Sequence, residues 1–468
     1  MKKIIEEATA QFKQNMEALC ENIDQEKPSP GMLSNLTEAL KVSSSQASRH
    51  AIQSYLESLD SKKKVLVVGE KTYRLKGPSA RELITFFGKI TFSRNLYQED
   101  RGGQAFIPVD RQVGISGRSA TPEVRGSVLY ASAHATPEEV TQLFGKVALF
   151  DISATAVKNI IRKADDTFAE HEDEIMAAIH EGEEVPQEAV TLVASIDGAN
   201  VLLNEPGGRK GRPQERPGEK ESGASSYRNA MVGATSFYGG ATSKKEGPKR
   251  FLSRYTAQMP EAGFPAFRER FATEIDHAES LIGEDAKKIL LCDGARPLWK
   301  YLNESPRFAD YECLLDFHHA MEHLSKAAEA IFGKGTAGAQ KWYRRWRANF
   351  LEKENTGKSL IRSIDRYCNE RKLSQSRKSA LARERTFFSR NESLMRYAEF
   401  RENGWPIGSG PVEAACKVVV KQRLCRSGMR WSREGGQRIL NLRSIVKSGR
   451  WDAFWETTRR YEELEMVA

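Results

Sequence analysis

The chain has 468 residues, of which 39% are hydrophobic and 29% are charged, and its mean hydropathy is -0.56. This length corresponds to about two to four domains, and no apolar run approaches the roughly 18 residues of a membrane-spanning helix, so a membrane protein is excluded. The six cysteines include no C-x-x-C pair, which argues against a disulfide framework and a zinc ribbon. No apolar segment follows Met1-Lys2-Lys3, so we expect no export signal and a cytoplasmic location.

The net charge of +9 is unevenly distributed along the chain. Residues 334–460 contain 30 Lys and Arg against 12 Asp and Glu, whereas the remainder contains 42 against 51. A basic segment of this kind is typical of a polyanion-binding surface, because Lys and Arg near phosphates release counterions. The alternative is a solvated helical face, which the charge alone favours equally.

The first 120 residues divide into two predicted parts. Residues 1–60 have apolar side chains at helical spacing, which predicts an N-terminal helical region that packs onto the body of the protein. Residues 61–120 contain short β-branched and aromatic runs separated by Gly and Pro, which predicts a small β-containing module.

Residues 121–185 are predicted to form a helix-turn-helix-like helical domain and a linker. Thr121, Thr136 and Ser153 each precede a run with helical apolar spacing, and Thr136 with Glu139 has the pattern of a capping box. In a helix-turn-helix the polar face of the last helix enters the major groove. The alternative is three packed helices without a DNA contact. The candidate DNA-binding residues of this helix are Lys158, Asn159, Arg162 and Lys163.

Residues 186–333 show a βββαβα pattern, and with the helical regions they predict an α+β multidomain protein. A loop at 205–226, rich in Gly, Pro, Arg and Glu, separates the first two strands. Its Lys210-Gly211-Arg212-Pro213 is similar to an AT-hook core, which would bind a minor groove, although a solvated loop is the favoured interpretation. The predicted strands are 191–197, 228–237, 250–259, 288–293 and 311–316, with a helix at 264–282.

Residues 334–404 lack strand signals and predict a basic all-helical insertion. Arginines alternate with aromatic residues from Lys341 to Arg347, a pattern that suits both nucleic-acid stacking and helix packing. We expect Trp342 and Trp346 to pack inward. The candidate DNA-binding residues are Arg344, Arg345 and Arg347.

Three acidic residues occupy positions that suit metal ligands. Asp197 and Asp293 are each predicted to close an apolar strand, and Glu413 follows Pro411 in the first turn of a predicted helix within residues 405–468. Asp-Gly is also an ordinary turn dipeptide, and Glu413 could simply form an i, i+4 pair with Lys417. The paired strand-end aspartates favour a shared site.

These acids and their surroundings resemble the Asp-Asp-Glu (DDE) triad of transposases with an RNase H-like core. The closer resemblance is to the ISKra-type bacterial insertion-sequence transposases and covers about residues 90–468. It rests on the motifs Ser195-Ile196-Asp197-Gly198, Leu291-Cys292-Asp293-Gly294-Ala295, Gly408-Ser409-Gly410-Pro411-Val412-Glu413-Ala414-Ala415-Cys416-Lys417, the segment 426–432 and the segment 449–455. Related transposases interrupt the RNase H-like core with an all-helical domain, which the resemblance places at 334–404.

The resemblance implies an enzyme that cleaves transposon ends and joins the freed 3′-OH to target DNA. Cleavage without a covalent intermediate uses two hard cations, and carboxylates suit Mg²⁺ or Mn²⁺, so Asp197, Asp293 and Glu413 are the expected ligands of two ions. The implied partners are terminal inverted repeats, target DNA and further copies of the chain in a dimer or larger assembly in the bacterial nucleoid. No Walker A motif is present, so ATP is not implied. Further candidate DNA contacts are Trp405, Lys417, Lys421, Arg423, Arg426 and Arg430; packing beside Pro406 is the alternative for Trp405.

Asp316-Phe317-His318-His319 resembles the Asp/Cys-x-x-His motif of Mutator-like and hAT-like transposases. That resemblance makes Asp316 and His319 supports of the active site. A packed helix start and a zinc pair of His319 with His323 are the alternatives. Many relatives carry a cysteine-rich zinc knuckle in the N-terminal β region, but residues 97–104 contain no cysteine. A catalytically inactive DNA-binding regulator and another RNase H-like nuclease are the competing functions.

Overall fold

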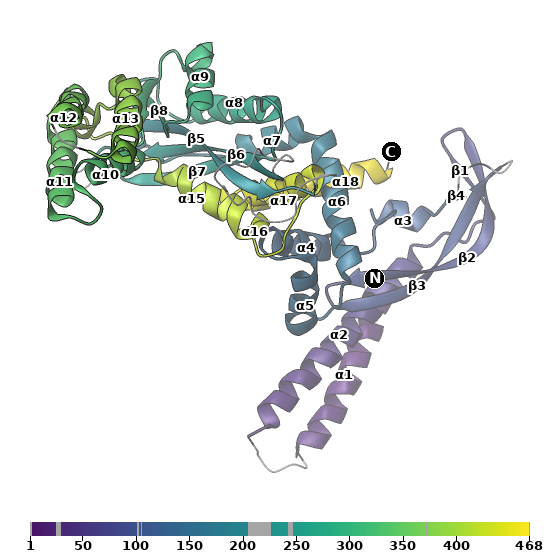
Figure 1. Ribbon diagram of the computed structural model, residues 1–468. Helices are drawn as coiled ribbons and strands as arrows, with labels where there is room; N and C mark the ends of the chain where they lie inside the picture. The colour runs from purple at the N-terminus through teal and green to yellow at the C-terminus, as the bar shows by residue number, and fades with distance from the viewer. Residues whose placement is uncertain are drawn as a thin grey trace. The chain divides into compact units, whose positions relative to one another are not determined.

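The computed structural model describes residues 2–24, 30–100, 103, 105–204, 226–241, 247–370 and 373–467. The protein is a mixed α+β chain that divides into two compact units, Met1–Ile179 with Trp451–Ala468, and His180–Arg450 (Figure 1). The predicted linker end at 185 therefore lies five to six residues beyond the observed division. The tetrapeptide at 210–213 lies outside the described residues. None of the helices described is both long and apolar enough to cross a membrane.

The first unit begins with two helices and a small antiparallel sheet. Helices α1 (Lys2–Asp24) and α2 (Met32–Ser58) pack against each other, which confirms the predicted helical region. The sheet has the order β1-β2-β3-β4, formed by β1 (Val65–Val68), β2 (Lys71–Thr85), β3 (Gly88–Glu99) and β4 (Ala105–Phe106). Strands β2 and β3 are longer than predicted because their pairing continues across Gly77, where the register shifts. The short helix α3 (Pro108–Gln112) follows.

Three packed helices follow, as the start signals predict. They are α4 (Pro122–His134), α5 (Pro137–Val147) and α6 (Ala154–Glu170), and α7 (Glu172–Glu181) comes next. The Thr136 hydroxyl accepts a hydrogen bond from the Glu139 N–H at 3.2 Å, and the Glu139 carboxylate accepts from the Thr136 N–H at 2.7 Å. The Ser153 hydroxyl caps α6 by accepting a hydrogen bond from the Ala156 N–H at 3.2 Å. These caps satisfy backbone donors that a helix start leaves unpaired.

The C-terminal helix α18 (Trp451–Val467) belongs to the first unit, although it was predicted to share a region with Glu413. The Glu462 carboxylate is 1% exposed and pairs with the Arg125 guanidinium of α4 at 2.7 Å. The Phe454 ring packs edge-on against Phe168 of α6, with the centroids 5.7 Å apart. The predicted domain 405–468 is therefore divided after Arg450, because burial of Glu462 and Phe454 fixes α18 on α4 and α6.

The second unit is built on a five-stranded sheet in the order β7-β6-β5-β8-β9. Its strands are β5 (Thr191–Leu202), β6 (Tyr227–Tyr238), β7 (Arg250–Gln258), β8 (Lys287–Cys292) and β9 (Glu312–Leu315), close to the predicted ranges. Strands β5, β6 and β7 are antiparallel neighbours, whereas β5, β8 and β9 run parallel. The parallel strands are short apolar runs because both of their faces are covered.

Helices cover both faces of this sheet (Figure 1). Helices α8 (Pro265–Ser280) and α9 (Arg296–Glu304) pack on the face that carries Ala194, Ile196 and Leu290. Helix α10 (Phe317–Phe332) packs on the face that carries Val193 and Leu291. The basic segment extends this second core with α11 (Ala337–Glu352), α12 (Thr356–Glu370), α13 (Gln375–Arg390), the 3-10 turn η3 (Glu392–Leu394) and α14 (Tyr397–Glu402). The 3-10 turn η2 (Pro306–Phe308) lies between α9 and β9 and packs into the core on the α8 and α9 side. Among the described residues of 334–404 there is no strand, so the helical prediction is confirmed.

Glu413 lies on a helix that changes its winding. Helix α15 (Gly410–Ala415) passes into a π-helical turn, η4 (Cys416–Lys421), then α16 (Gln422–Leu424), and α17 (Arg433–Lys447) follows. A π turn displaces backbone carbonyls from their usual α-helical partners. The Arg443 guanidinium of α17 donates to the carbonyl of Val419 at 2.6 Å and to that of Val418. Arg443 thus stabilises the unusual turn that follows Glu413.

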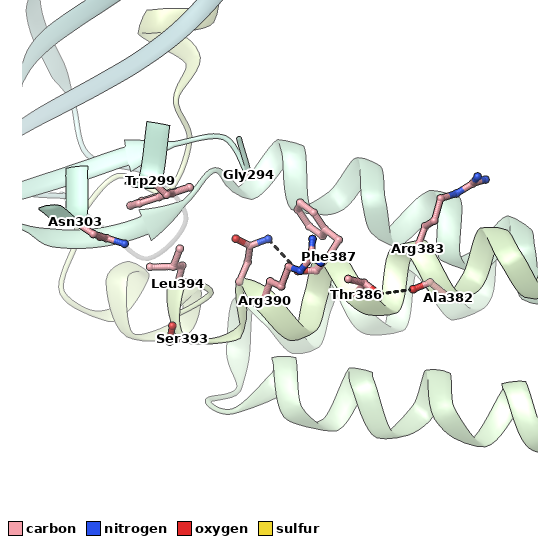
Figure 2. A pocket seen from close by; sticks show the side chains of 11 residues that line it. Gly294, Trp299, Asn303, Ala382, Arg383, Thr386, Phe387, Arg390, Ser393 and Leu394 are labelled. Atoms are coloured by element: carbon pink, nitrogen blue, oxygen red, sulfur yellow. Dashed lines mark hydrogen bonds between the residues drawn. The ribbon is translucent and has the colours of Figure 1, made fainter. Parts of the chain in front are cut away.

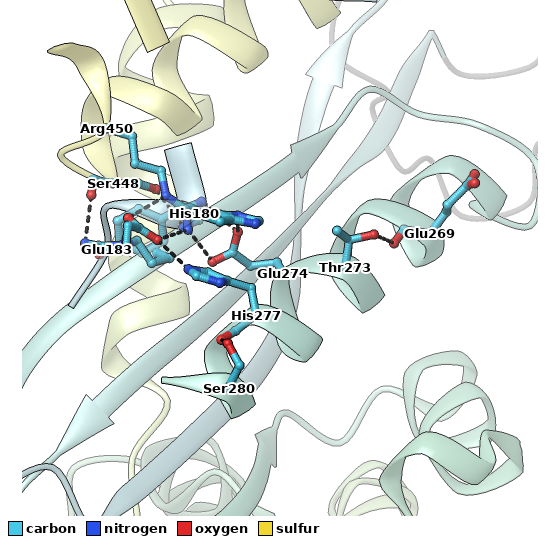
Figure 3. A network of polar contacts seen from close by, with 11 residues as sticks. His180, Glu183, Glu269, Thr273, Glu274, His277, Ser280, Ser448 and Arg450 are labelled. Carbon is cyan, nitrogen blue, oxygen red and sulfur yellow. Dashed lines mark hydrogen bonds and ion pairs between the residues drawn. The ribbon is translucent and has the colours of Figure 1, made fainter. Parts of the chain in front are cut away.

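A buried ionic network closes the second unit (Figure 3). The Arg450 guanidinium forms two hydrogen bonds each with Glu183 and Glu274, at 2.6 to 2.9 Å. Glu183 also pairs with Arg254 at 2.8 Å and with His277 at 2.9 Å. Burial opposes ionisation of Glu183, but the hydrogen bond and charge of Arg450 outweigh it and lower the pKa of Glu183 to about 2. The network joins the segment after α7 to α8 and to the end of α17.

We expect Glu183→Gln to destabilise the second unit by roughly 1–3 kcal/mol at neutral pH, because a charged hydrogen-bond acceptor is lost. The pKa of Glu183 is lower in the folded than in the unfolded chain, so its contribution is complete above about pH 4.5 and is lost as the pH falls toward about 2. Urea unfolding of wild type and variant across this range should show converging free energies. Glu434→Gln, which alters an exposed i, i+4 pair, is the control and should differ little from wild type. A difference between wild type and Glu183→Gln that does not depend on pH would contradict this account.

Candidate active site

Asp197 lies within β5 and does not close it, which corrects the prediction of a strand end. The strand continues to Leu202 because residues 197–202 remain paired with β6, where Asp197 lies opposite Val232. The parallel pairing with β8, however, ends at Ala194. Because side chains alternate along a strand, Asp197 is on the same face as Val193, the face that α10 covers. Its carboxylate is therefore three residues beyond the paired part of the parallel sheet.

Asp293 directly follows β8, as predicted. Its Oδ1 accepts a hydrogen bond from the Ala295 N–H at 2.9 Å, and its backbone carbonyl accepts one from the Trp299 indole at 2.6 Å. Burial raises the pKa of Asp293, the Ala295 N–H and His319 partly oppose this, and the charges of Asp197 and Asp316 raise it further. The charges of Asp197 and Asp316 therefore act on Asp293, which indicates that the three carboxylates lie near one another.

Asp316 directly follows β9 and caps α10, and it is fully buried. Its carboxylate accepts two hydrogen bonds, from the N–H of His319 and from the N–H of Ser409, both at 2.6 Å. Its own N–H donates to the Cys292 carbonyl at 2.8 Å. Asp316 therefore connects the residue before Asp293 with the loop that enters α15, which agrees with both the supporting role and the helix-start interpretation.

Glu413 lies in the first turn of α15, as predicted, and its pKa is raised. Partial desolvation of this otherwise exposed side chain is the main cause, the charges of Asp316 and Asp197 add to it, and His318 and Lys417 oppose it. The Cys416 thiol, one turn later, is hydrogen-bonded to Asp197, and burial together with this acid raises the pKa of the thiol. The fold thus brings the three predicted acids together and adds Asp316. Sequence reasoning missed Cys416 and His318, which carry no spacing signal of their own.

The donor set suits a hard divalent cation. Asp197, Asp293 and Glu413 offer carboxylate oxygens, which Mg²⁺ and Mn²⁺ prefer. Within the described part of the chain, none of these acids forms an ion pair with Lys or Arg, so the charges of His319, His318 and Lys417 oppose their mutual repulsion only in part. Their ligating atoms are not all within 4.8 Å of one another; the described residues that meet that limit are His180, Glu183 and His277. In that second group, Glu183 already pairs with the guanidinium groups of Arg450 and Arg254, so its charge is neutralised without a metal ion.

His319 lies beside Asp293, and its neighbour His323 is engaged with a carboxylate. Its ring meets those of His323 and Phe387 at centroid distances of 4.9 and 5.7 Å. The His323 Nδ1 is instead 2.6 Å from the Glu384 carboxylate of α13. Neither histidine belongs to the three-ligand group found among the described residues. The supporting role of His319 therefore fits its placement better than the zinc alternative does.

Most candidate DNA-binding residues near Glu413 are exposed. Trp342 and Trp346 are buried, as expected. The Trp405 ring packs edge-on against Phe400, and the Lys287 ammonium lies 4.7 Å from its centroid, which matches the packing alternative. The exposed candidates are Arg344, Arg345, Arg347, Lys417, Lys421, Arg426 and Arg430.

Arg423 requires a correction. It was predicted to contact DNA, but it is 1% exposed and its guanidinium lies 5.3 Å from the Trp431 ring centroid. A side chain buried to this extent packs the turn after η4 and has no surface to offer to DNA. The charge pattern wrongly predicts a DNA contact here because a long arginine side chain can bury both its methylene groups and its guanidinium against an aromatic ring.

The candidates on α6 have contacts within the first unit. Lys158 pairs with Glu138 at 3.0 Å, and Arg162 pairs with Asp166 at 3.6 Å. The Lys163 ammonium donates to the Gly117 carbonyl, and Asn159 is exposed. Exposed pairs of this kind are weak, so the helix-turn-helix interpretation stays a prediction.

A pocket of about 720 Å³ adjoins the acids and was missed by sequence reasoning (Figure 2). It lies between α9, which was not predicted, and α13. Trp299 and Asn303 line it from α9, and Gly294 lines it from the turn after Asp293. The Trp299-x-x-x-Asn303 spacing, which places both side chains on one helical face, was the available signal.

Comparison with known proteins identifies no relative by sequence. No protein-family model matches the chain, and no curated protein matches it. Among solved structures, the chain is similar to the Drosophila P element transposase strand transfer complex at 13% sequence identity. The similarity covers 73% of this chain and 82% of that chain, with a TM-score of 0.27. No family is assigned on this basis.

We expect Asp316→Asn to destabilise the second unit by about 1–3 kcal/mol. The asparagine amide presents an N–H₂ group to one of the two backbone donors, so one hydrogen bond is lost and a buried donor is left unpaired. Urea unfolding measures the loss. Asp285→Asn, an exposed acid after α8, is the matched control and should change the free energy of unfolding by less than about 0.5 kcal/mol. Equal stability of the two variants would contradict the connecting role of Asp316.

Proposed function

We propose that the chain is a DNA transposase that cleaves transposon ends and joins the freed 3′-OH to target DNA. The observation that carries this proposal is the convergence of Asp197, Asp293 and Glu413, from a central strand, the end of its parallel neighbour and a helix start. The sheet order and strand directions support an RNase H-like core, because such a core has three antiparallel strands followed by two parallel ones. The motifs around the three acids support the DDE assignment.

In this proposal Asp197, Asp293 and Glu413 hold two Mg²⁺ or Mn²⁺ ions. Bound cations of this kind activate the attacking oxygen and stabilise the leaving oxygen of a phosphodiester. Asp197 is the central ligand because both other acids interact with it. Asp316 positions Ser409, and with it the helix start that carries Glu413. His319 lies beside Asp293 and stabilises its ionised form.

The surroundings of Glu413 suit a DNA backbone. Lys417 and Lys421 are exposed and lie on the π-helical turn that directly follows the helix of Glu413. Arg344, Arg345 and Arg347 add exposed cations on α11. Helices α4 to α6 are proposed to bind the transposon ends, and two active sites acting on two ends require a dimer or larger assembly. The same site could serve a nuclease that does not join strands, and the products distinguish the two.

Asp293→Asn and Glu413→Gln should each lower Mg²⁺-dependent strand cleavage by at least about 100-fold. Replacing a residue that only hydrogen-bonds to a metal ligand typically lowers activity by about 10- to 100-fold, and replacing the ligand itself should lower it further. The assay uses DNA that carries the inverted repeats flanking the gene. Binding of that DNA in a gel-shift assay should be retained, because the lysines and arginines are unchanged.

Asp285→Asn is the matched control and should cleave as wild type does. Equal cleavage by Asp293→Asn and wild type would disprove the acid assignment. Binding without cleavage by wild type in either Mg²⁺ or Mn²⁺ would favour the inactive regulator instead.

Alanine at Arg344, Arg345 and Arg347 together should flatten the salt dependence of DNA binding. Each arginine that contacts a phosphate contributes about one unit to the slope of log K against log salt concentration. Alanine at Lys3, Lys13 and Lys41, three exposed lysines of α1 and α2, removes the same charge and serves as the control. An unchanged slope in the arginine variant would contradict this prediction and favour the alternative, that the arginines of α11 form a solvated helical face.

A further inference from the structure

The pocket between α9 and α13 has the size of a small-ligand site (Figure 2). Its volume of about 720 Å³ lies within the range of roughly 300–1,000 Å³ that is common for such sites. Trp299 and Asn303 line one side, and Arg383, Phe387 and Arg390 line the other. It is open to solvent, and the acids described above do not line it.

The pocket is joined to the acid cluster through the chain itself. The Trp299 indole donates to the carbonyl of Asp293, and the next residue, Gly294, forms part of the pocket wall. A Cβ atom on Gly294 would lie 2.6 Å from the Phe387 ring, so the backbone approaches that ring as closely as glycine permits. A ligand at the Gly294 wall of the pocket would therefore lie one residue away from Asp293.

The aromatic wall is held rigidly. The Phe387 ring stacks on the His323 ring with centroids 3.5 Å apart and an angle of 10°. The His323 Nδ1 is 2.6 Å from the Glu384 carboxylate, which is buried. One face of Phe387 is thus occupied by His323, the rings of His319 and Phe388 also meet it, and another part of the ring lines the pocket. A rigid wall reduces the entropic cost of ordering a ligand against it.

The polar groups of the pocket suit an anion with a planar ring. Arg383 and Arg390 are exposed and seven residues apart, so they lie on one face of α13. In the described part of the chain neither forms an ion pair, whereas Arg385 of the same helix is paired with Asp365. Guanidinium groups bind phosphates and stack on bases, while the amide of Asn303 can pair with the edge of a base.

We propose that this pocket binds a single unpaired nucleotide of a DNA strand, with its base against Phe387 and the phosphates on either side of it on Arg390 and Arg383, which flank Phe387 on α13 (Figure 2). The nucleotide would belong to the DNA strand whose phosphate meets the acids, so the inference rests on the proposed function. A free nucleoside monophosphate has the same chemistry and is the other source that the experiment separates. The adjoining Asp293 would then act on a strand whose next base is removed from the duplex, at the cost of unstacking it.

The test uses a short DNA duplex that carries one unpaired 2-aminopurine, with Mg²⁺ omitted so that no cleavage occurs. Binding to wild type should change the 2-aminopurine fluorescence. Arg383→Gln and Arg390→Gln should each weaken this binding by about 10- to 100-fold, the value of a charge-assisted hydrogen bond. Lys378→Gln removes an exposed charge from α13 outside the pocket and should bind as wild type does. All three residues are exposed, so folding should not be impaired.

Weakening by the two arginine variants alone would support the pocket. Displacement of the DNA signal by adenosine monophosphate, with the same dependence on the arginines, would support a nucleotide site that also accepts free nucleotides. Equal binding by all variants, or no preference for the unpaired base over a paired one, would overturn the proposal.

The two proposals fail separately. Asp293→Asn should lower cleavage by at least about 100-fold while it keeps the 2-aminopurine signal. An arginine-dependent signal in a wild-type protein that cleaves no DNA would contradict the proposed function and leave the pocket supported. Cleavage that depends on Asp293, without an arginine-dependent signal, would overturn the pocket and leave the proposed function supported.

Discussion

The buried carboxylate of Asp316 connects the segments that carry the acids. It accepts hydrogen bonds from the backbone N–H groups of His319 and of Ser409, and Ser409 lies 93 residues after Asp316 in the chain. Its own N–H is bonded to the carbonyl of Cys292, the residue before Asp293. Burying a carboxylate costs free energy, and charge-assisted hydrogen bonds offset that cost. Since Glu413 follows Ser409 by one helical turn, the geometry of Asp316 sets how far Asp293 and Glu413 lie from each other.

Holding several carboxylates together is unfavourable, and the structure opposes the repulsion only in part. Two helices begin among the acids, α10 after Asp316 and α15 before Glu413, although α15 is short. The positive end of a helix dipole stabilises negative charge there. Lys417, His318 and His319 also lower the pKa of a neighbouring acid, yet those of Asp293 and Glu413 stay raised. The remaining negative charge is what a divalent cation would neutralise, so cation binding and ordering of the site should be coupled.

Sequence reasoning succeeded where the signal was local. The Thr136 capping box, the Ser153 cap and the apolar runs of β5 and β8 predicted elements that the structure contains. The strand end at Asp197 was wrong because Asp-Gly favours a turn, whereas pairing with β6 extends the strand. That pairing involves residues about 30 positions away, which a local pattern cannot show.

The pocket and the buried arginines were missed for a similar reason. Phe387 reaches Gly294 from a helix nearly a hundred residues farther along the chain, so no spacing near Asp293 indicates it. Arg423 has the composition of a DNA contact, but Trp431 covers it. The packing neighbours of a helix decide which of its faces is buried. In the sequence, only the spacing of apolar residues indicates the buried face, so a buried arginine gives no signal.

The basic charge of the C-terminal quarter therefore has two roles. Arg423, Arg443 and Arg450 are each less than 5% exposed. Arg443 binds the carbonyls of the π turn, and Arg450 binds two buried glutamates, so these charges stabilise the fold that presents Glu413. The arginines of α11 and α13 that face solvent lie on helices whose opposite faces pack into the core around α10. A count of Lys and Arg along the sequence therefore overestimates how many positive charges a polyanion can reach. The exposed lysines and arginines are concentrated beside Glu413 and along the pocket near Asp293.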